Sequence, residues 1–358
     1  MKHSLLNHQK ERNSMGKNHQ LPSSKVAQEF GEVNVCKVGN EYEILFTILM
    51  EPSGKDAEGW KTGVALDSSV SLQWAYGKKL EGKVPPEVMK SYRAKGWVDS
   101  EIIDGLPVSY MKKEANHDAI EKGYLHYSEN IMQKLAHDFV SYLADNLDSQ
   151  GKTLVAYWAC GTGKEFEILG ELSSEEFKNI RLTGSKKHGF GKKTCLLPVL
   201  KAFQEELGKA KRSMAIFLTD GNLEDFEEVK EYTIQMAQKI AAGQKNFMKC
   251  VLIGVGDQIS EEQMEILDDL ETGTDIDIWD HKIAKEMRSL LEIFAEVVDE
   301  NQIIAPTATI LDDKGKIVKQ FSDGLPAKVT FTMPATSKHF VLQIGQQKII
   351  QNIEYPEA

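Results

Sequence analysis

The chain has 358 residues, of which 41% are hydrophobic and 27% charged, a composition that suits a soluble protein with more than one domain. Its formal net charge of −11 argues against a nucleic-acid-binding surface as the main function, because such surfaces need clustered Lys and Arg. The N-terminus lacks the apolar core of a signal peptide, and no segment approaches the roughly 20 apolar residues of a membrane helix, so we expect a cytoplasmic protein without a membrane partner.

The predicted elements begin after a polar N-terminal segment. Residues 1–29 are expected to be a mobile tail, because they hold few apolar side chains and several turn-forming residues. Residues 33–50 have the chemistry of two strands joined by a tight turn. A short apolar run at residues 60–66 then ends abruptly at Asp67, which is typical of a buried strand at the start of an α/β unit.

Strands and helices alternate through the middle of the chain. The helices are predicted from apolar residues that recur every three or four positions, and the strands from short buried runs. Helices are expected at 131–143, 196–207, 226–240 and 260–269, with a last one carrying Ile283, Met287, Leu290, Phe294 and Val297. Strands are expected at 154–159, 214–218, 248–255 and 276–279. Ser128 is expected to cap the first helix. This alternation predicts a doubly wound, mostly parallel α/β sheet over residues 60–300, with helices on both faces.

The chain on either side of the α/β segment has short strands and no helical periodicity. Neither the two strands before residue 50 nor the short strands after residue 301 can build a core easily by themselves. We therefore expect residues 30–59 and 301–358 to pair into one small all-β sandwich, into which the α/β domain is inserted.

One segment fits neither domain. Residues 77–126 separate the first strand of the sheet from its expected helix, whereas such connections are usually a handful of residues long. A long insertion beside the end of a strand can serve as a lid or a docking loop, and it can equally be an ornament without function.

Polar side chains follow the first strand in the pattern Asp67-x-Ser69-x-Ser71. In an open α/β sheet, ligands bind at the carboxyl ends of the strands, near the point where the strand order reverses. Thr194, in a loop before a helix, and Asp220, at the end of a later strand, can reach the same place. All five side chains offer oxygen, which favours a hard divalent cation, Mg²⁺ first and then Mn²⁺ or Ca²⁺, over zinc.

The residue types in this set indicate binding and not catalysis. Three hydroxyl ligands are neutral, and the two aspartates contribute a charge of −2, so a bound divalent ion stays electron-poor and attracts an outside carboxylate. These segments contain no evident general base, since they lack a histidine, a lysine or a third carboxylate suited to that role. We expect the partner to be another protein that presents an Asp or Glu to the metal.

The same segments resemble the von Willebrand factor A domain family. The residues that carry the resemblance are GWKTGVALDSSVS from residue 59, GKKTCLL from residue 191 and AIFLTDGN from residue 215, which are similar to the three parts of the metal-ion-dependent adhesion site. Within that family the chain looks closest to the bacterial tellurium-resistance type, through WKTGVALDSS and VLIGVGDQ…EILDDLE. Val70 stands where the family often has glycine.

The resemblance covers roughly residues 60–300 and implies a Rossmann-like fold, metal-ligand roles for Asp67, Ser69, Ser71, Thr194 and Asp220, and work inside the cell, in a stress-response or tellurium-resistance type of assembly. Two other functions stay open. One is a Mg²⁺-dependent, phosphatase-like enzyme, although such enzymes need a second carboxylate two residues after the first, where this chain has Ser69. The other is a scaffold whose metal site is degenerate.

Each of these residues also has a plain structural interpretation. The Asp67 to Ser71 segment could be a helix cap or a polar turn, Thr194 could cap the helix that follows it, and Asp220 could be a turn residue. Loop residues 184–193 contain four lysines, which could be a solvated surface or could steer an acidic partner toward the metal. The sequence GTGK from residue 161 lacks the spacing of a phosphate-binding loop, so no nucleotide is expected.

Overall fold

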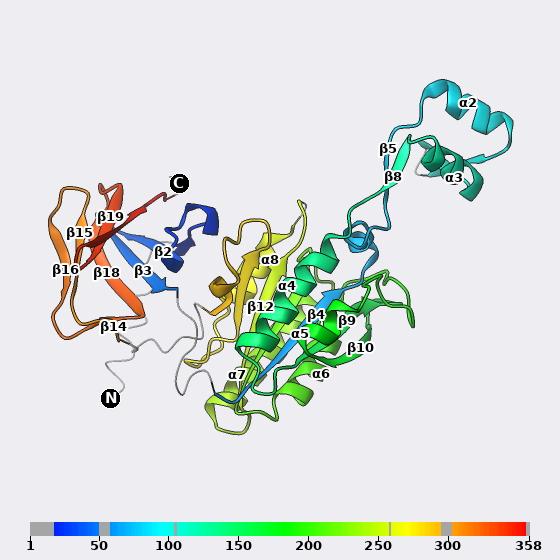
Figure 1. The fold of residues 1–358 in the computed structure, drawn as a ribbon. Coiled ribbons are helices and arrows are strands. Elements are labelled where there is room, and N and C mark those ends of the chain that lie inside the picture. Colours follow the sequence, from blue (N-terminus) through cyan, green and yellow to red (C-terminus); the bar gives the residue numbers. More distant parts are fainter. Residues whose placement is uncertain (1–17, 50–57, 104–105, 258, 295–302, 356–358) are drawn as a thin grey trace.

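The structure is a computed structural model that describes residues 18–49, 58–103, 106–257, 259–294 and 303–355. It contains a central α/β body, a β-sandwich beside it and a small arm that projects from the α/β body (Figure 1). None of the helices in these described ranges is both long enough and apolar enough to cross a membrane.

The α/β body is built on a six-stranded, mostly parallel sheet. Its strands, in spatial order, are β10 (Glu165–Leu172), β9 (Thr153–Cys160), β4 (Trp60–Asp67), β11 (Arg212–Thr219), β12 (Phe247–Gly254) and β13 (Trp279–Ile283). Only β10, at one edge, runs antiparallel to its neighbour. Numbered by their appearance in the chain, these strands lie in the order 3-2-1-4-5-6, so the strand order reverses beside β4. A doubly wound sheet binds ligands at this reversal point, at the carboxyl ends of its strands.

Helices cover both faces of this sheet, as the alternation in the sequence predicts. One face packs against η3 (Val70–Tyr76), α4 (Ile131–Asn146), α5 (Ser174–Lys178) and η4 (Leu290–Phe294). The other packs against α6 (Leu197–Leu207), α7 (Phe226–Ala241) and α8 (Glu261–Asp268). Side chains of β4 alternate between the faces, with Val64 and Leu66 toward α4 and Ala65 toward α6. Gly63 lets α6 come close, because a Cβ there would lie 2.8 Å from side-chain atoms of Phe203 and Leu207.

The β-sandwich contains strands from both ends of the chain. One sheet has the order β1 (Asn18–Gln20), β2 (Phe30–Val38), β3 (Glu41–Ile48) and β18 (Lys328–Pro334). The other has the order β16 (Ile317–Phe321), β15 (Ala308–Asp312), β19 (His339–Ile344) and β20 (Gln347–Asn352), and β14 (Ile303–Ala305) pairs with β17 (Leu325–Pro326). Antiparallel pairing of β3 with β18 joins the two ends of the chain.

Aromatic side chains join the two sheets of the sandwich. The ring of Phe46, on β3, lies 4.6 Å from that of Phe30 and 5.4 Å from that of Phe340, which belongs to the opposite sheet. All three rings are fully buried. Aromatic pairs at these distances are stabilising beyond the area that they bury.

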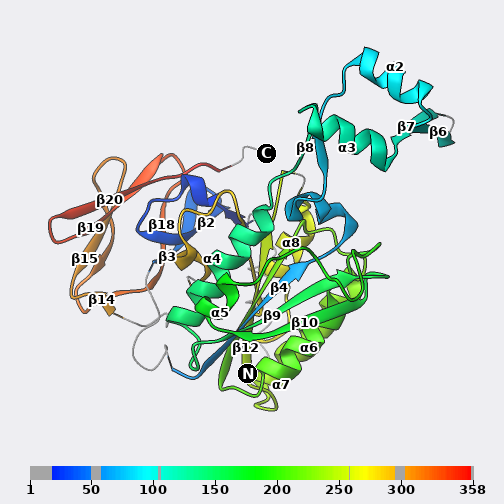
Figure 2. The same ribbon diagram turned by 45° about the vertical axis from the view of Figure 1, so that its right-hand side comes forward.

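The arm is formed by the insertion that follows η3. Its neck is the antiparallel pair β5 (Leu80–Gly82) and β8 (Leu125–Tyr127). Beyond the neck lie α2 (Pro86–Ala94), the hairpin of β6 (Val98–Ile103) and β7 (Leu106–Met111), and α3 (Lys113–Glu121). Tyr92, Ala115 and Ala119 are its buried residues. Both ribbon views show the arm extending away from the sheet, from the end where β4 terminates (Figures 1 and 2).

The N-terminal segment differs from the mobile tail expected for residues 1–29. Residues 1–17 lie outside the described residues, but β1 pairs with β2, and η1 (Ser23–Lys25) follows it. Leu21 and Val26 are buried in the sandwich core. Strand pairing and the burial of these two apolar side chains therefore hold this polar segment against the sandwich.

The prediction of a helix over residues 283–297 is also wrong. Ile283 belongs to β13, which begins at Trp279, later than the strand expected at 276–279. Between β13 and the end of the described segment at Phe294, the one helical element is η4. Val297 lies outside the described residues. The apolar side chains of Met287 and Leu290 still pack on the sheet, so the spacing reflected burial and not a regular helix.

Two smaller expectations are also corrected. Asn130, and not Ser128, caps α4, because its side chain accepts a hydrogen bond from the Gln133 N–H at 3.0 Å. The Ser128 hydroxyl instead donates to the Trp74 carbonyl oxygen at 2.8 Å, near the base of the arm. The edge strand β10 was not expected, since its residues read as part of a polar loop.

The aromatic contacts between the sandwich sheets lead to a stability prediction. Phe46→Ala should destabilise the sandwich by about 3–5 kcal/mol, because it leaves a cavity between the two sheets. All five tryptophans lie outside the sandwich strands, four in the α/β body and Trp97 on the arm. Tryptophan fluorescence therefore does not report on the sandwich, whereas far-UV circular dichroism follows the whole chain. In a urea titration we expect circular dichroism to change at lower urea in this variant. Ile350→Ala is the control, because this side chain is 59% exposed, and it should change the free energy of unfolding by no more than about 0.5 kcal/mol. Equal changes in the two variants would contradict the packing of Phe46 between the two sheets.

Candidate functional site

The candidate site lies where β4 and β11 end side by side. These strands pair in parallel up to Leu66 and Leu218, so Asp67 on one and Thr219 on the other are the next residues at the same edge. The Thr219 hydroxyl donates a hydrogen bond of 2.8 Å to Asp67 Oδ2, across 152 positions of sequence. Two segments far apart in the chain therefore meet at the reversal point of the sheet.

Asp67 is a buried carboxylate with few compensating contacts. It is fully buried, and its Oδ1 accepts the Ser69 N–H at 2.8 Å. The pKa of Asp67 is raised to about 7, first by burial and second by the charge of Asp220, while the hydrogen bonds from Ser69 and Thr219 oppose that rise. A positive charge at this edge would oppose both causes and lower the pKa of Asp67.

The two serines direct hydroxyl groups to one point. Ser69 Oγ and Ser71 Oγ lie 2.9 Å apart, and Ser69 is buried whereas Ser71 is exposed. Ser69 occupies the N-cap position of η3, but its side chain makes no capping hydrogen bond within the described part of the chain. The helix-cap interpretation of Ser69 is therefore not supported by a capping hydrogen bond, and the two hydroxyl groups bond to each other.

The loop that leads to Thr194 lies directly along this segment. The Val70 N–H donates to the Gly191 carbonyl oxygen at 2.8 Å, and the Gly191 N–H donates to the Ser68 carbonyl oxygen at 2.9 Å. Gly191 is required for this approach, since a Cβ there would lie 2.0 Å from the Ala159 carbonyl oxygen. The lysines of the same loop, at positions 186, 187, 192 and 193, are exposed.

Thr194 is buried and is tied to the segment after Asp220. Its N–H donates to the Glu224 carboxylate, and its carbonyl oxygen accepts the Glu224 N–H at 3.0 Å. It does not cap the next helix, because α6 begins later, with Leu196 at its N-cap position. The carboxylate of Asp225 instead accepts the N–H groups of Leu196 and Leu197, each at 2.8 Å.

Asp220 directly follows β11 and lies near enough to Asp67 for its charge to raise the pKa of that carboxyl. Its carbonyl oxygen accepts the Ser260 N–H at 2.9 Å, while its carboxylate makes one long contact, 3.5 Å from the Asn222 N–H. The structure thus brings Asp67, Ser69, Ser71 and Asp220 to one edge of the sheet, and hydrogen bonds place the Thr194 loop against both segments. What these groups share is oxygen chemistry, with two carboxylates and three hydroxyls.

Glu224 and Asp225 were not expected as parts of this region. Both carboxylates follow Asp220 in the sequence NLEDF, where Asp225 occupies the N-cap position of α7. The Asp225 side chain makes no cap hydrogen bond to α7 and holds the start of α6 instead. The unusual signal in the sequence was the acidic pair Glu224 and Asp225, which follows the Thr-Asp-Gly segment after two intervening residues.

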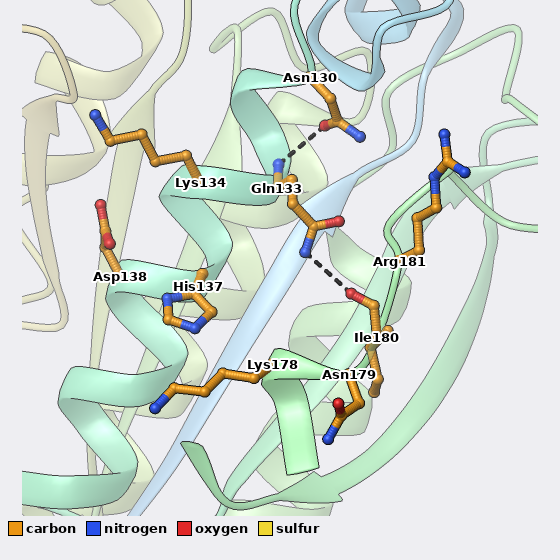
Figure 3. Close-up of a pocket in the computed structure, with 9 residues that line it drawn as sticks. All are labelled: Asn130, Gln133, Lys134, His137, Asp138, Lys178, Asn179, Ile180 and Arg181. Carbon is orange, nitrogen blue, oxygen red and sulfur yellow. Dashed lines mark hydrogen bonds between the residues drawn. The ribbon is translucent and has the colours of Figure 1, made fainter. Parts of the chain in front are cut away.

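Two other features do not converge on a ligand. In the loop after β9, the N–H and hydroxyl of Thr162 both donate to Glu165 Oε2 at 2.8 Å, so an acidic side chain occupies the donors that a phosphate would need. A hollow of about 480 Å³ lies between α4 and the segment after α5. Its cationic side chains Lys134, Lys178 and Arg181 point in different directions (Figure 3).

Comparisons with known proteins give no family for this chain. No family model matches it, and no curated protein matches it either. Among solved structures, the chain is similar to the PilB minor pilin from Streptococcus sanguinis, with a TM-score of 0.34 and 10% identity over 79% of this chain and 76% of that chain. A likeness this weak supports no conclusion on fold or function.

The burial of Asp67 leads to a prediction on pH. In the folded, metal-free protein the Asp67 carboxyl keeps its proton up to about pH 7, whereas in the unfolded chain it releases that proton near pH 3.8. The free energy of unfolding should therefore fall as pH rises from about 4 to 7, by on the order of 4 kcal/mol. Asp67→Asn should remove this contribution and make the metal-free protein more stable than the wild type at pH 8.

The measurement is the melting temperature in the presence of a chelator between pH 4 and 8. Asp138→Asn is the matched control, because it removes one exposed carboxylate from the same domain. The control should keep the pH dependence of the wild type. A wild-type curve that is flat over this range would refute the assignment of a desolvated carboxylate at position 67.

Proposed function

We propose that this chain is a protein-binding module of the von Willebrand factor A type, which captures a carboxylate of a partner protein through a metal-ion-dependent adhesion site. Asp67, Ser69, Ser71, Thr194 and Asp220 would hold the ion, with Mg²⁺ expected and Mn²⁺ and Ca²⁺ as alternatives. The observation that carries this proposal is the buried Asp67 carboxylate, which meets the charge of Asp220 and lies beside two serine hydroxyls that cap no helix.

The donor set fits a hard divalent cation. Carboxylate and hydroxyl oxygens are the ligands that Mg²⁺, Mn²⁺ and Ca²⁺ prefer, and the set contains neither nitrogen nor sulfur. When bound, such an ion supplies a coordination position for an outside carboxylate. Ser71 is exposed, whereas the neighbouring Ser69 is buried. The free coordination position of the ion would therefore face solvent on the side of Ser71, where a partner side chain can reach it.

The same residues favour binding over hydrolysis. The position two residues after Asp67, where a phosphatase of this architecture needs its second carboxylate, is Ser69. The Glu224 carboxylate, which also lies in this region, accepts a hydrogen bond from the Thr194 N–H. In this arrangement it is not available as a general base. A binding module needs no such base.

The first test measures whether Mg²⁺ binding stabilises the protein, and the second measures whether the bound metal captures a carboxylate. Mg²⁺ at 100 times its dissociation constant should stabilise the protein by about 2.7 kcal/mol, which corresponds to a rise in melting temperature of roughly 5–10 °C. Ser71→Ala should abolish most of this rise. Ser109→Ala is the matched control, since Ser100 Oγ and Ser109 Oγ form an exposed hydroxyl pair 3.0 Å apart on the arm, and it should respond to Mg²⁺ as the wild type does.

An array of peptides that contain Asp or Glu then tests the capture of a carboxylate. We expect binding in Mg²⁺ that disappears with chelator, with Ser71→Ala, and when Asn or Gln replaces the acidic residue of the peptide. A protein without any Mg²⁺-dependent rise in melting temperature would count against the metal site. If the protein binds Mg²⁺ but its binding of acidic peptides does not depend on the metal, the metal site stands and the proposed capture of a partner carboxylate is refuted.

The lysines before Thr194 lead to a kinetic prediction. The chain carries a net charge of −11, so an acidic partner is repelled at long range, and the four exposed lysines make the field beside the site locally positive. Replacing Lys186, Lys187, Lys192 and Lys193 together by Gln should slow association with an acidic peptide from the array roughly tenfold at low salt, with little change in dissociation. The difference should fade near 1 M salt, where the Debye length is about 3 Å.

Thr194→Ala is the counterpart variant, because it removes a ligand and leaves the lysines. It should speed dissociation and leave association almost unchanged, as read by surface plasmon resonance. If the four-lysine variant associates at the wild-type rate at every salt concentration, the loop is only a solvated surface.

A further inference from the structure

A second cluster of metal-binding side chains lies at the opposite edge of the sheet from β10. Asp280 and His281 belong to β13, the edge strand, and Asp268 is the last residue of α8, which packs against it. One ligand atom from each of these three residues lies within 4.8 Å of the others. The cluster is separate from the five oxygen ligands proposed above, and it adds an imidazole nitrogen to the carboxylates.

The carboxylate of Asp280 is incompletely satisfied. Its side chain is 2% exposed. Its Oδ1 accepts the His281 N–H at 2.7 Å and the Lys282 ammonium at 2.9 Å. Its Oδ2 is buried and has no hydrogen-bond partner among the described residues. Leaving a buried acceptor unpaired costs about 1–3 kcal/mol, and more for a charged group, so a native protein normally supplies a partner from solvent or from a ligand.

The surroundings of the cluster favour a cation. Asp268 lies at the carboxyl end of α8, where the helix carbonyl groups carry partial negative charge, and the last turn of α8 contains no basic side chain. Lys282 balances one of the two carboxylates. With a neutral imidazole, Asp268, Asp280 and Lys282 sum to a charge of −1, which a divalent ion would change to +1.

We infer that Asp268, Asp280 and His281 form a second metal site, for a zinc-type ion that binds nitrogen and oxygen. Imidazole with carboxylates suits Zn²⁺ and Co²⁺, whereas Mg²⁺ and Ca²⁺ select oxygen alone. Three protein ligands leave a fourth tetrahedral position for water. This site goes beyond the proposed capture of a carboxylate, because it is at another strand and selects another class of ion.

The ligand atoms of the cluster lie near the spacing of a tetrahedral site. Metal–ligand bonds of about 2.0–2.2 Å place the ligand atoms of a tetrahedral site roughly 3.3–3.6 Å apart. His281 Nδ1 now lies 2.6 Å from Asp268 Oδ2, so this hydrogen bond would be exchanged for two bonds to the ion. The side chains of His281 and Asp268 are 14% and 23% exposed, which gives an ion access from solvent on their side of the edge.

Co²⁺ is the probe, because its visible absorption reports a tetrahedral site. The Ser71→Ala protein serves as background, so that the first proposed site does not compete for the ion. We expect this protein to bind one Co²⁺ per chain by equilibrium dialysis, with tetrahedral absorption that Zn²⁺ displaces and Mg²⁺ does not. His281→Gln and Asp280→Asn, added to this background, should each lower the affinity at least tenfold.

The matched control is His117→Gln, because His117 Nε2 and Glu121 Oε1 form an exposed pair 3.4 Å apart on the arm. This variant should bind Co²⁺ as its background does. Asp268→Asn, at a partly exposed position, replaces Asp280→Asn if the latter does not fold. Absence of Co²⁺ binding, or unchanged binding in both His281→Gln and Asp268→Asn, would overturn the second site. His281→Gln alone should keep the Mg²⁺-dependent rise in melting temperature, so each site can fail without the other.

Discussion

The parallel pairing of β4 with β11 is the constraint on which the rest of the site depends. These strands occupy the middle of the sheet, and their pairing sets Asp67 beside Thr219 although 152 positions of sequence separate them. The helices that follow the two strands, η3 and α7, pack on different faces of the sheet. The Asp67 carboxylate at this edge is fully buried, and burial is the first cause of its raised pKa.

Hydrogen bonds between loops, more than regular secondary structure, assemble the remainder of the site. The Gly191 loop bonds to Ser68 and Val70, and Thr194 exchanges two hydrogen bonds with Glu224. Asp225 then fixes the start of α6, although it lies at the start of α7. These bonds connect all three loops, so a change in one loop is expected to affect the others. Such a connected arrangement suits a site that must hold several ligands around one ion.

The large-scale organisation places the candidate functions at different parts of the same sheet. The sandwich holds both ends of the chain together through β3 and β18, and Arg288, just after β13, donates to the Phe30 carbonyl oxygen of the sandwich at 2.9 Å. The arm leaves from the end of the sheet at which Asp67 lies (Figure 2). The Asp268, Asp280 and His281 cluster lies at the β13 edge, nearer in sequence to Arg288 than to the first site. A partner that approaches Ser71 would therefore meet the base of the arm, and the β13 edge is a separate surface.

The sequence by itself determined the class of the fold and the identity of the candidate ligands. Periodicity predicted most of the alternating strands and helices, because burial on a sheet or a helix face imposes its own spacing. The Asp67-x-Ser69-x-Ser71 pattern predicted the edge of the sheet at which these polar side chains lie, because strand ends in an α/β sheet meet at one edge; their role as metal ligands stays a prediction. Tertiary structure alone decided three other matters. Asp225 caps α6 and not its own helix, the spacing around Ile283 and Met287 forms no regular helix, and Asp280 and His281 meet Asp268 across an edge. Each of these depends on which groups lie nearby in space, and local propensity carries no information about contacts between distant segments.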